Sequence, residues 1–127
     1  MKEIIPIAIE KSYLEGKGLV AQDPSATDDS VTTDGPVSNS AHTFHEEKIH
    51  VSVIESEPAK VRIDGHPYDE FVHILEGRLI LTLDDGREFK FEQGDSLVVP
   101  KGYTGTWHMP EKYRELVVTD WPPTDPN

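Results

Sequence analysis

Apolar and polar residues alternate in short runs from about residue 44 to residue 120. Alternation with a period of two over four to eight residues is typical of a half-buried β-strand. Turn sequences such as Asp84-Asp85-Gly86 separate the runs, and no stretch shows a convincing helical period. The pattern therefore predicts an all-β sandwich or barrel. The expected strands are 49–55, 60–64, 71–75, 78–83, 88–92, 96–100, 105–109 and 114–120.

The first third of the chain differs from the rest in composition and in its pattern of apolar residues. Residues 4–9, IIPIAI, are expected to form an edge strand, where Pro6 is tolerated. Residues 23–40 are almost all small, polar or acidic, which predicts a long surface loop. We therefore expect an N-terminal arm and acidic loop over 1–43, a barrel over 44–121 and a flexible tail over 122–127.

Length and charge narrow the class of protein. A chain of 127 residues is expected to form a single domain, and the absence of cysteine excludes disulfides and thiolate chemistry. The formal charge of −12 disfavours nucleic acid and anionic membranes as partners. No stretch approaches the roughly 20 apolar residues of a membrane helix, and the N-terminus lacks a signal-peptide pattern. We expect a cytoplasmic protein.

The spacing of glycine and proline residues indicates the fold more specifically than the strand pattern does. Glu70 is followed after six residues by Gly77, and Gly94 is followed after five residues by Pro100 and then by Gly102. This spacing resembles the two conserved motifs of the cupin superfamily. The resemblance implies a double-stranded β-helix, the cupin jelly-roll barrel, as a single domain with a long N-terminal arm and loop.

The runs 55–64, 69–79 and 94–107 resemble a narrower group of small cupins. That group lies near the ureidoglycine aminohydrolase and ethanolamine-utilisation-type cupins, and most of its members have no assigned reaction. The resemblance implies a homodimer. The apolar residues 4–9 and the outer strand faces favour a dimer as well.

In a typical cupin, three histidines and one glutamate hold a divalent metal inside the barrel. Carried over by position, the glutamate is Glu70, the second histidine of the first motif is His66, and the first is replaced by Asp64. The histidine of the second motif falls on Gly105, which has no side chain, and its asparagine falls on Met109. The resemblance thus implies His66, Glu70 and Asp64 as candidate ligands for Mn, Fe, Ni or Zn.

Strand parity supports this grouping, because even-numbered residues from 62 to 70 would share one face of an unbroken strand. The structural alternative is that Glu70 faces inward only to pair with Arg62 or Lys60. Three other histidines are interpreted as surface residues: His42, His45 and His50. The candidate ligand-pocket residues are Arg62, Tyr68, Tyr103, Trp107 and His108, although parity puts His108 on the outer face unless a β-bulge turns it.

Three functions remain open. The first is an enzyme that acts on a small polar metabolite (ureido, amino or carboxylate) with a metal at His66 and Glu70. The second is a metal-free module that binds a small molecule in a degenerate metal site. The third is a barrel filled by its own side chains. No nucleophile or phosphate-loop motif is present.

Overall fold

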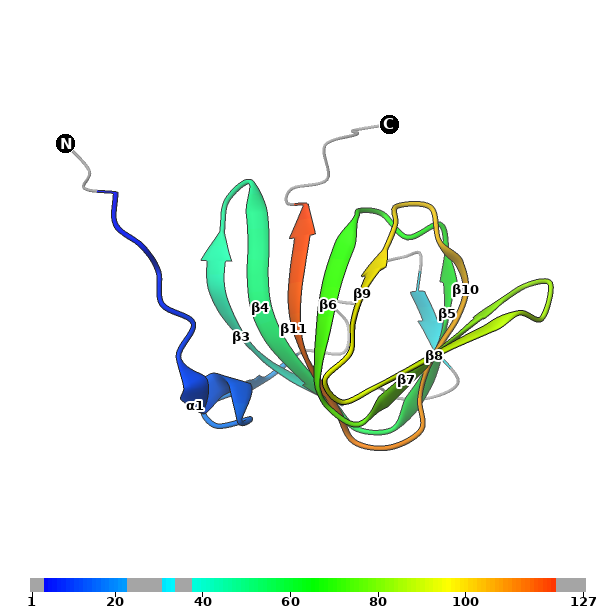
Figure 1. The fold of residues 1–127 in the computed structure, drawn as a ribbon, viewed down its shortest axis with the longest axis horizontal. Helices are drawn as coiled ribbons and strands as arrows, with labels where there is room; N and C mark the ends of the chain where they lie inside the picture. Colours follow the sequence, from blue (N-terminus) through cyan, green and yellow to red (C-terminus); the bar gives the residue numbers. More distant parts are fainter. Residues whose placement is uncertain (1–3, 23–30, 34–37, 121–127) are drawn as a thin grey trace.

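Two antiparallel β-sheets face each other in the computed structural model and enclose one apolar core, as in a jelly-roll barrel (Figure 1). The structure describes residues 4–22, 31–33 and 38–120. Its elements are α1 (Lys11–Leu14), β1 (Val20–Ala21), β2 (Val31–Thr33), β3 (Asn39–Glu46), β4 (Ile49–Ser56), β5 (Ala59–Asp64), β6 (Glu70–Glu76), β7 (Arg78–Leu83), β8 (Glu88–Glu92), β9 (Ser96–Val99), β10 (Thr104–Met109) and β11 (Tyr113–Asp120). The six-stranded sheet has the order β1-β3-β4-β11-β6-β9, and the five-stranded sheet has the order β2-β5-β10-β7-β8.

The predicted all-β single domain is confirmed, and the alternation in the sequence explains it. On β11 every second residue from Tyr113 to Thr119 is buried, and on β6 the same holds for Glu70, Val72 and Ile74. Strands of the facing sheet supply the other half of the core, with Val61 and Ile63 on β5. A one-residue slip in register would turn these side chains out to water, so the hydrophobic pattern fixes the pairing.

The N-terminal third departs from expectation in three places. Residues 4–9 form no strand, and a short helix, α1, follows them. The predicted 23–40 loop contains β2, which pairs with β5, and the start of β3. Both sheets therefore draw on residues before 44. These strands were missed because β2 and the start of β3 consist mostly of polar residues, which leave almost no periodic apolar signal. The predicted tail lies outside the described residues.

Helix α1 is fastened to the outer side of the six-stranded sheet. The Tyr13 ring stacks on His42 with 3.7 Å between ring centroids and an interplanar angle of 6°. Arg114 Nε donates a hydrogen bond to the Leu14 carbonyl oxygen at 2.9 Å. His42, interpreted from sequence as a surface residue, is thus half-buried under the N-terminal segment. Within the described ranges, no helix is long and apolar enough to cross a membrane.

Candidate functional site

A buried hydrogen bond joins His66 and Glu70 inside the barrel. His66 Nε2 lies 2.6 Å from Glu70 Oε1, and the two side chains are 7% and 8% exposed. Glu70 is the first residue of β6, and His66 lies in the turn that precedes it. A pair this short and this buried is shielded from competing water, so it holds the imidazole in one orientation.

The turn that carries His66 is tied to the turn between β9 and β10. The His66 backbone N–H donates to the Tyr103 carbonyl oxygen at 2.9 Å, and the Gly102 N–H donates to the His66 carbonyl oxygen at 2.8 Å. The Lys101 N–H donates to Asp69 Oδ1 at 2.9 Å. The two glycine-punctuated motifs thus meet in space, which explains why their spacing carries the fold signal.

Aromatic rings from two elements surround His66. The Trp107 ring is inclined by 25° to the imidazole, with centroids 6.5 Å apart, and the Tyr68 ring meets the imidazole edge-on, with centroids 5.0 Å apart. Trp107 points inward from β10 and is buried. The Tyr103 hydroxyl donates to the Thr106 carbonyl oxygen at 2.8 Å, and burial raises the pKa of that hydroxyl. Trp107 and Tyr68 therefore lie next to the His66–Glu70 pair, whereas Tyr103 contacts His66 only through its backbone carbonyl group.

Arg62 and Asp64 lie on the outer side of the barrel, away from His66 and Glu70. Because β5 turns Val61 and Ile63 inward, the residues between and after them face outward. Arg62 Nε donates to Asp64 Oδ1 at 3.0 Å, and Arg62 also pairs with Asp84.

The hydrogen bond between Arg62 and Asp84 lowers the pKa of Asp84. Because the strand does not run unbroken to Glu70, the even-numbered residues from 62 to 70 do not share one face, and Glu70 bonds His66 rather than the alternative partner Arg62. The strand ends at Asp64, and the turn reverses the parity.

Parity holds on β10, where His108 faces outward and pairs across the strands with Lys60 and Ile80. Gly105 faces inward, in the position of the missing metal ligand. A Cβ atom there would lie 2.3 Å from the Thr82 carbonyl oxygen and 2.8 Å from the Tyr103 hydroxyl oxygen. The local backbone therefore excludes a side chain at position 105, rather than merely lacking one.

Sequence reasoning missed a second buried acid, Glu115, and its neighbour Tyr113. Both side chains point inward from β11, where they are 4% and 2% exposed. Burial and the charge of Glu70 raise the pKa of Glu115 to about 8, and burial raises the pKa of Tyr113. The signal in the sequence was parity, because Glu115 lies on the same strand face as the inward-facing residues Tyr113 and Val117.

Five buried side-chain polar atoms have no hydrogen-bond partner within the described part of the chain, and His66 Nδ1, the Tyr113 hydroxyl and Glu115 Oε1 are three of them. Tyr113 and Glu115 are nevertheless close enough for their contact to raise the pKa of Tyr113, so His66 Nδ1 is the clearest unsatisfied atom. Buried polar groups in folded proteins are nearly always hydrogen-bonded, to protein, water or ligand. Water or a small polar molecule that reached these atoms would satisfy them.

The donor set does not fit a cupin metal centre. His66 and Glu70 direct their donor atoms at each other, Asp64 faces solvent, and Gly105 supplies none. Across residues 4–22, 31–33 and 38–120, no three His, Cys, Asp or Glu side chains gather closely enough to hold a metal ion. Metal sites of the histidine and carboxylate type use at least three such ligands.

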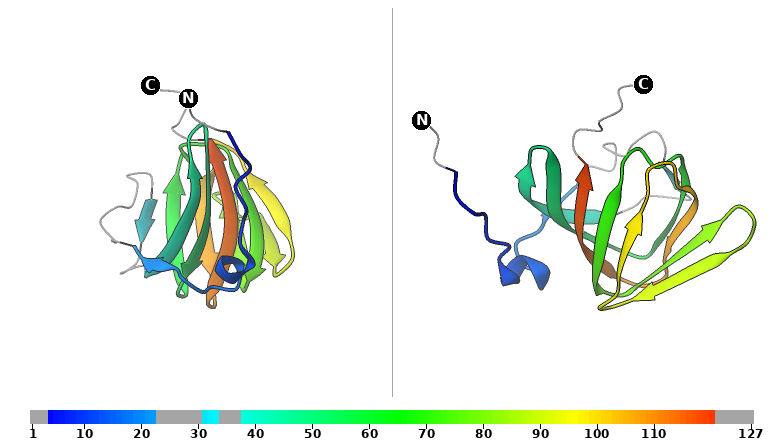
Figure 2. Two further views of the ribbon diagram at one scale, coloured as in Figure 1. Left: turned by 90° about the vertical axis from the view of Figure 1, so that its left-hand side faces the viewer. Right: turned by 45° about the horizontal axis from the view of Figure 1, so that its top comes forward.

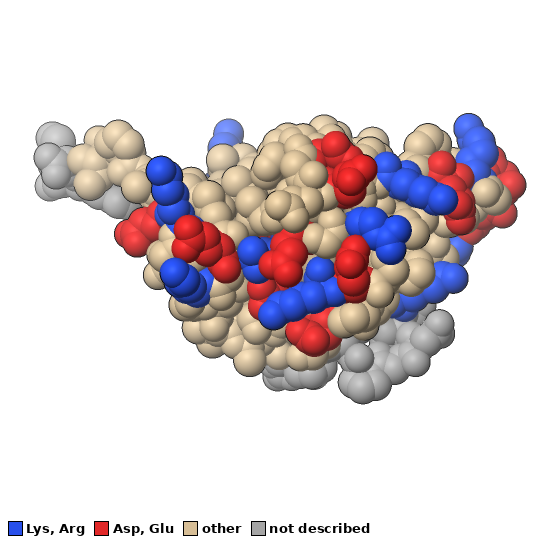
Figure 3. All heavy atoms as spheres, turned by 60° about the horizontal axis from the view of Figure 1, so that its bottom comes forward, with Lys and Arg blue, Asp and Glu red and all other residues tan. Residues whose placement is uncertain are grey.

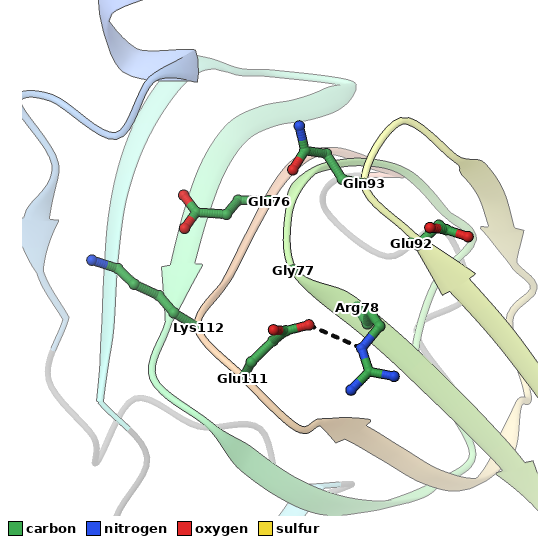
Figure 4. Close-up of a pocket in the computed structure, with 7 residues that line it drawn as sticks. All are labelled: Glu76, Gly77, Arg78, Glu92, Gln93, Glu111 and Lys112. Carbon is green, nitrogen blue, oxygen red and sulfur yellow. Dashed lines mark hydrogen bonds and ion pairs between the residues drawn. The ribbon is translucent and has the colours of Figure 1, made fainter.

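A shallow cleft lies at the other end of the barrel (Figure 4). It is lined by Glu76, Gly77, Arg78, Glu92, Gln93, Glu111 and Lys112. Arg78 Nε donates to Glu111 Oε1 at 2.9 Å, and both side chains are more than half exposed. Side chains of both charges cover this end of the barrel (Figure 3). The cleft is a solvated, internally paired surface, so the buried pair is the better candidate site.

The fold and the two joined motifs define a cupin. A family model of the EutQ-like cupin domain matches residues 45–115, more than half of the chain. The chain belongs to this family. No curated protein matches the chain.

Solved structures share the fold at low sequence identity. A protein of unknown function from Pseudomonas syringae pv. tomato is 21% identical over 80% of this chain and 43% of that one, with a TM-score of 0.67. EutQ from Salmonella typhimurium is 22% identical over 68% of this chain and 72% of that one, with a TM-score of 0.58. The polyketide cyclase RemF from Streptomyces resistomycificus is 16% identical over 94% and 79%, with a TM-score of 0.60.

These likenesses show the fold alone. The chain spans less than half of the length of the Pseudomonas protein.

Proposed function

We propose that this cupin binds a small polar metabolite inside its barrel without a metal, and that His66 is the contact residue. The observation that supports the proposal is the buried bond from His66 Nε2 to Glu70, which leaves the buried Nδ1 atom without a partner among the described residues. When Nε2 carries the proton shared with the carboxylate, Nδ1 is an acceptor. The ligand class is then one with an N–H or O–H donor, such as a ureide, an amine or a hydroxy acid.

The surroundings of His66 support binding of a flat, polar group. Trp107 and Tyr68 provide aromatic surface on the imidazole, and two backbone hydrogen bonds hold the His66 turn in place. Because the ring is already oriented, little conformational entropy is lost on binding. The protonated form of Glu115 adds a second donor on the inner face of β11.

A thermal-shift and calorimetry screen tests this proposal on chelator-treated protein with ureides, amines and hydroxy acids. We expect at least one class to raise the melting temperature of the native chain and to lose that effect in His66→Ala. His108→Ala is the matched control, since His108 faces outward on β10 and should leave binding intact. Binding that survives His66→Ala, or no stabilisation by any class, contradicts the proposal.

The metal-dependent alternative is decided by metal analysis of the same samples after reconstitution with Mn, Fe, Ni or Zn. Near-stoichiometric metal that disappears in a His66→Ala, Glu70→Ala double variant would replace our proposal with that alternative. Turnover of a bound ligand would extend our proposal from binding to catalysis, since an imidazole oriented by a carboxylate is a suitable general base.

A further inference from the structure

The two sheets of the barrel are not joined by backbone pairing along one side. The strand at the edge of the five-stranded sheet is β8, and β9 is at an edge of the six-stranded sheet. Among the described residues, β8 pairs only with β7, and β9 pairs only with β6. No ladder of backbone hydrogen bonds therefore joins β8 to β9, and we call the line between these two strands the seam.

The seam is closed at one end and widens toward the other. At the closed end lies the turn 93–95, where the Asp95 N–H donates to the Glu92 carbonyl oxygen at 2.9 Å. The Gly94 N–H donates to the Ile74 carbonyl oxygen at 2.8 Å and fastens this turn to β6. Away from the turn, the hairpin of β7 and β8 diverges from β9 (Figures 1 and 2). The two edge strands can part there without breaking the ladder of either sheet.

The wide end of the seam lies beside the His66–Glu70 pair. Glu70 is paired across the six-stranded sheet with Val99 of β9. Val99 comes five residues after Gly94 in the turn, and Phe89 of β8 comes five residues before it. Because both strands leave the same turn and rise about 3.3 Å per residue, Phe89 and Val99 lie at a similar distance from the turn on opposite sides of the seam.

Phe89 faces the barrel interior and is nevertheless only partly covered. Cross-strand pairing on the five-stranded sheet places one row of residues on its inner face: Val61, Trp107, Leu81 and Phe89. The first three are at most 8% exposed, whereas Phe89 is 45% exposed. Trp107 is also the ring that lies next to the His66 imidazole. One apolar row therefore runs from the buried imidazole to solvent at the seam.

We infer that the ligand of this protein is an amphiphile that enters through the seam, with its polar group at His66 Nδ1 and an apolar tail on Phe89. This inference rests on the proposed function, since His66 is the polar contact. Nδ1 is buried without a partner among the described residues, so a donor group of the ligand satisfies it. The exposed part of the Phe89 ring is stabilised when an apolar tail removes it from water.

The spacing of the row limits the size of the tail. Two strand spacings, about 10 Å, separate Trp107 from Phe89 on the sheet. This span suits a phenyl group that is carried one or two carbon atoms from the polar group. The ligand class is therefore an aryl-substituted amine, ureide or hydroxy acid, rather than the short polar metabolite alone.

Calorimetry on chelator-treated protein tests the inference with matched pairs of probes: ethylamine and 2-phenylethylamine, methylurea and benzylurea, lactate and 3-phenyllactate. In at least one pair, we expect the phenyl compound to bind about tenfold or more tightly than the short one, because its ring is removed from water at Phe89. Phe89→Ala should remove most of this advantage and leave the affinity for the short compound unchanged. Phe71→Ala is the matched control, because Phe71 is 41% exposed and faces outward on β6.

The short compounds separate failure of this inference from failure of the proposed function. If a short compound binds through His66 and the phenyl group adds no affinity, the inference is overturned and the proposed function stands. An advantage of the phenyl compound that survives Phe89→Ala overturns the inference as well. If no compound binds, or if binding survives His66→Ala, the proposed function is wrong and the inference is lost with it.

A thiol at the seam tests the entry route directly. The chain has no cysteine, so Phe89→Cys introduces a single reporter. We expect N-ethylmaleimide to label this thiol readily in the free protein and several-fold more slowly when the phenyl compound is saturating. In the control Phe71→Cys, the labelling rate should not depend on the compound. Slow labelling in the free protein, or labelling that the compound does not alter, contradicts entry through the seam.

Discussion

Two acid–base clusters lie close together in the chain and differ in almost every physical respect. His66 and Glu70 are buried inside the barrel and bond at 2.6 Å. Arg62, Asp64 and Asp84 lie on the outer surface, where their side chains are 36%, 59% and 60% exposed. Asp64 and His66 are only two residues apart, yet the barrel wall separates them. The comparison shows that the turn after β5, rather than sequence spacing, decides which polar residues meet in the interior.

Solvent determines what each cluster contributes. Exposed ion pairs are screened by water and salt and add little to stability. A buried pair is not screened, and removal of one partner leaves the other without a hydrogen bond in a low-dielectric interior. Function that depends on fixed geometry is therefore expected of the inner cluster.

The largest effect should come from the wall between the two clusters, at Gly105. The change Gly105→Ala should lower the free energy of unfolding by about 3 kcal/mol or more, because the new Cβ would overlap the Thr82 carbonyl oxygen on β7. Gly102→Ala is the control: its positive φ of 93° costs about 1 kcal/mol, but its Cβ meets no atom within 4 Å. Urea unfolding measures both. Equal losses would show that β10 has room for a side chain, and a ligand at position 105 would again be feasible.

The next effect tests whether the interior holds a neutral acid beside a charged one. Glu115 has a pKa of about 8 in the folded protein, well above its unfolded value, so the unfolded chain loses its proton first as the pH rises. Glu115 should therefore cost no stability near pH 4, and its cost should grow between pH 4.5 and 8. The neutral variant Glu115→Gln should be more stable than the native chain by on the order of 2–3 kcal/mol at pH 7.

Chemical unfolding across this pH range measures the difference between the two chains. Glu70→Gln is the companion variant. It removes the charge that helps to raise the Glu115 pKa and should move the pH-dependent step to lower pH. A difference between Glu115→Gln and the native chain that does not vary with pH would contradict the assignment.

The smallest effect is expected in the outer cluster. Arg62→Ala should leave the melting temperature nearly unchanged in molar salt, because Arg62 is an exposed partner of two exposed carboxylates. It should also keep any ligand affinity that His66→Ala abolishes. Loss of binding in Arg62→Ala would restore Arg62 to the ligand pocket and remove the distinction between the two clusters.

Much of the fold was predictable because strand periodicity is a local property. The predicted strands 78–83 and 88–92 coincide with β7 and β8, where Leu79 and Phe91 face each other. The same periodicity put Trp107 inward and His108 outward. It failed for β2, a three-residue strand, since so short a segment shows no period and is defined by its pairing with β5.

The candidate site was predictable only in part. Motif spacing identified His66 and Glu70, and the structure brings them together. It also suggested Asp64, which faces outward because β5 turns its neighbour Ile63 inward, and the turn after the strand then brings His66 to the inner side. Glu115 was overlooked, since no motif contains it and only the folded barrel buries it where the charge of Glu70 raises its pKa.

The sequence by itself determined the barrel, its turns and the pair His66–Glu70, because alternation and glycine positions act over a few residues. Only the tertiary structure decided which polar side chains share the interior and that position 105 has no room for a ligand. The physical reason is that burial and steric exclusion depend on segments distant in the chain, such as Thr82 against Gly105.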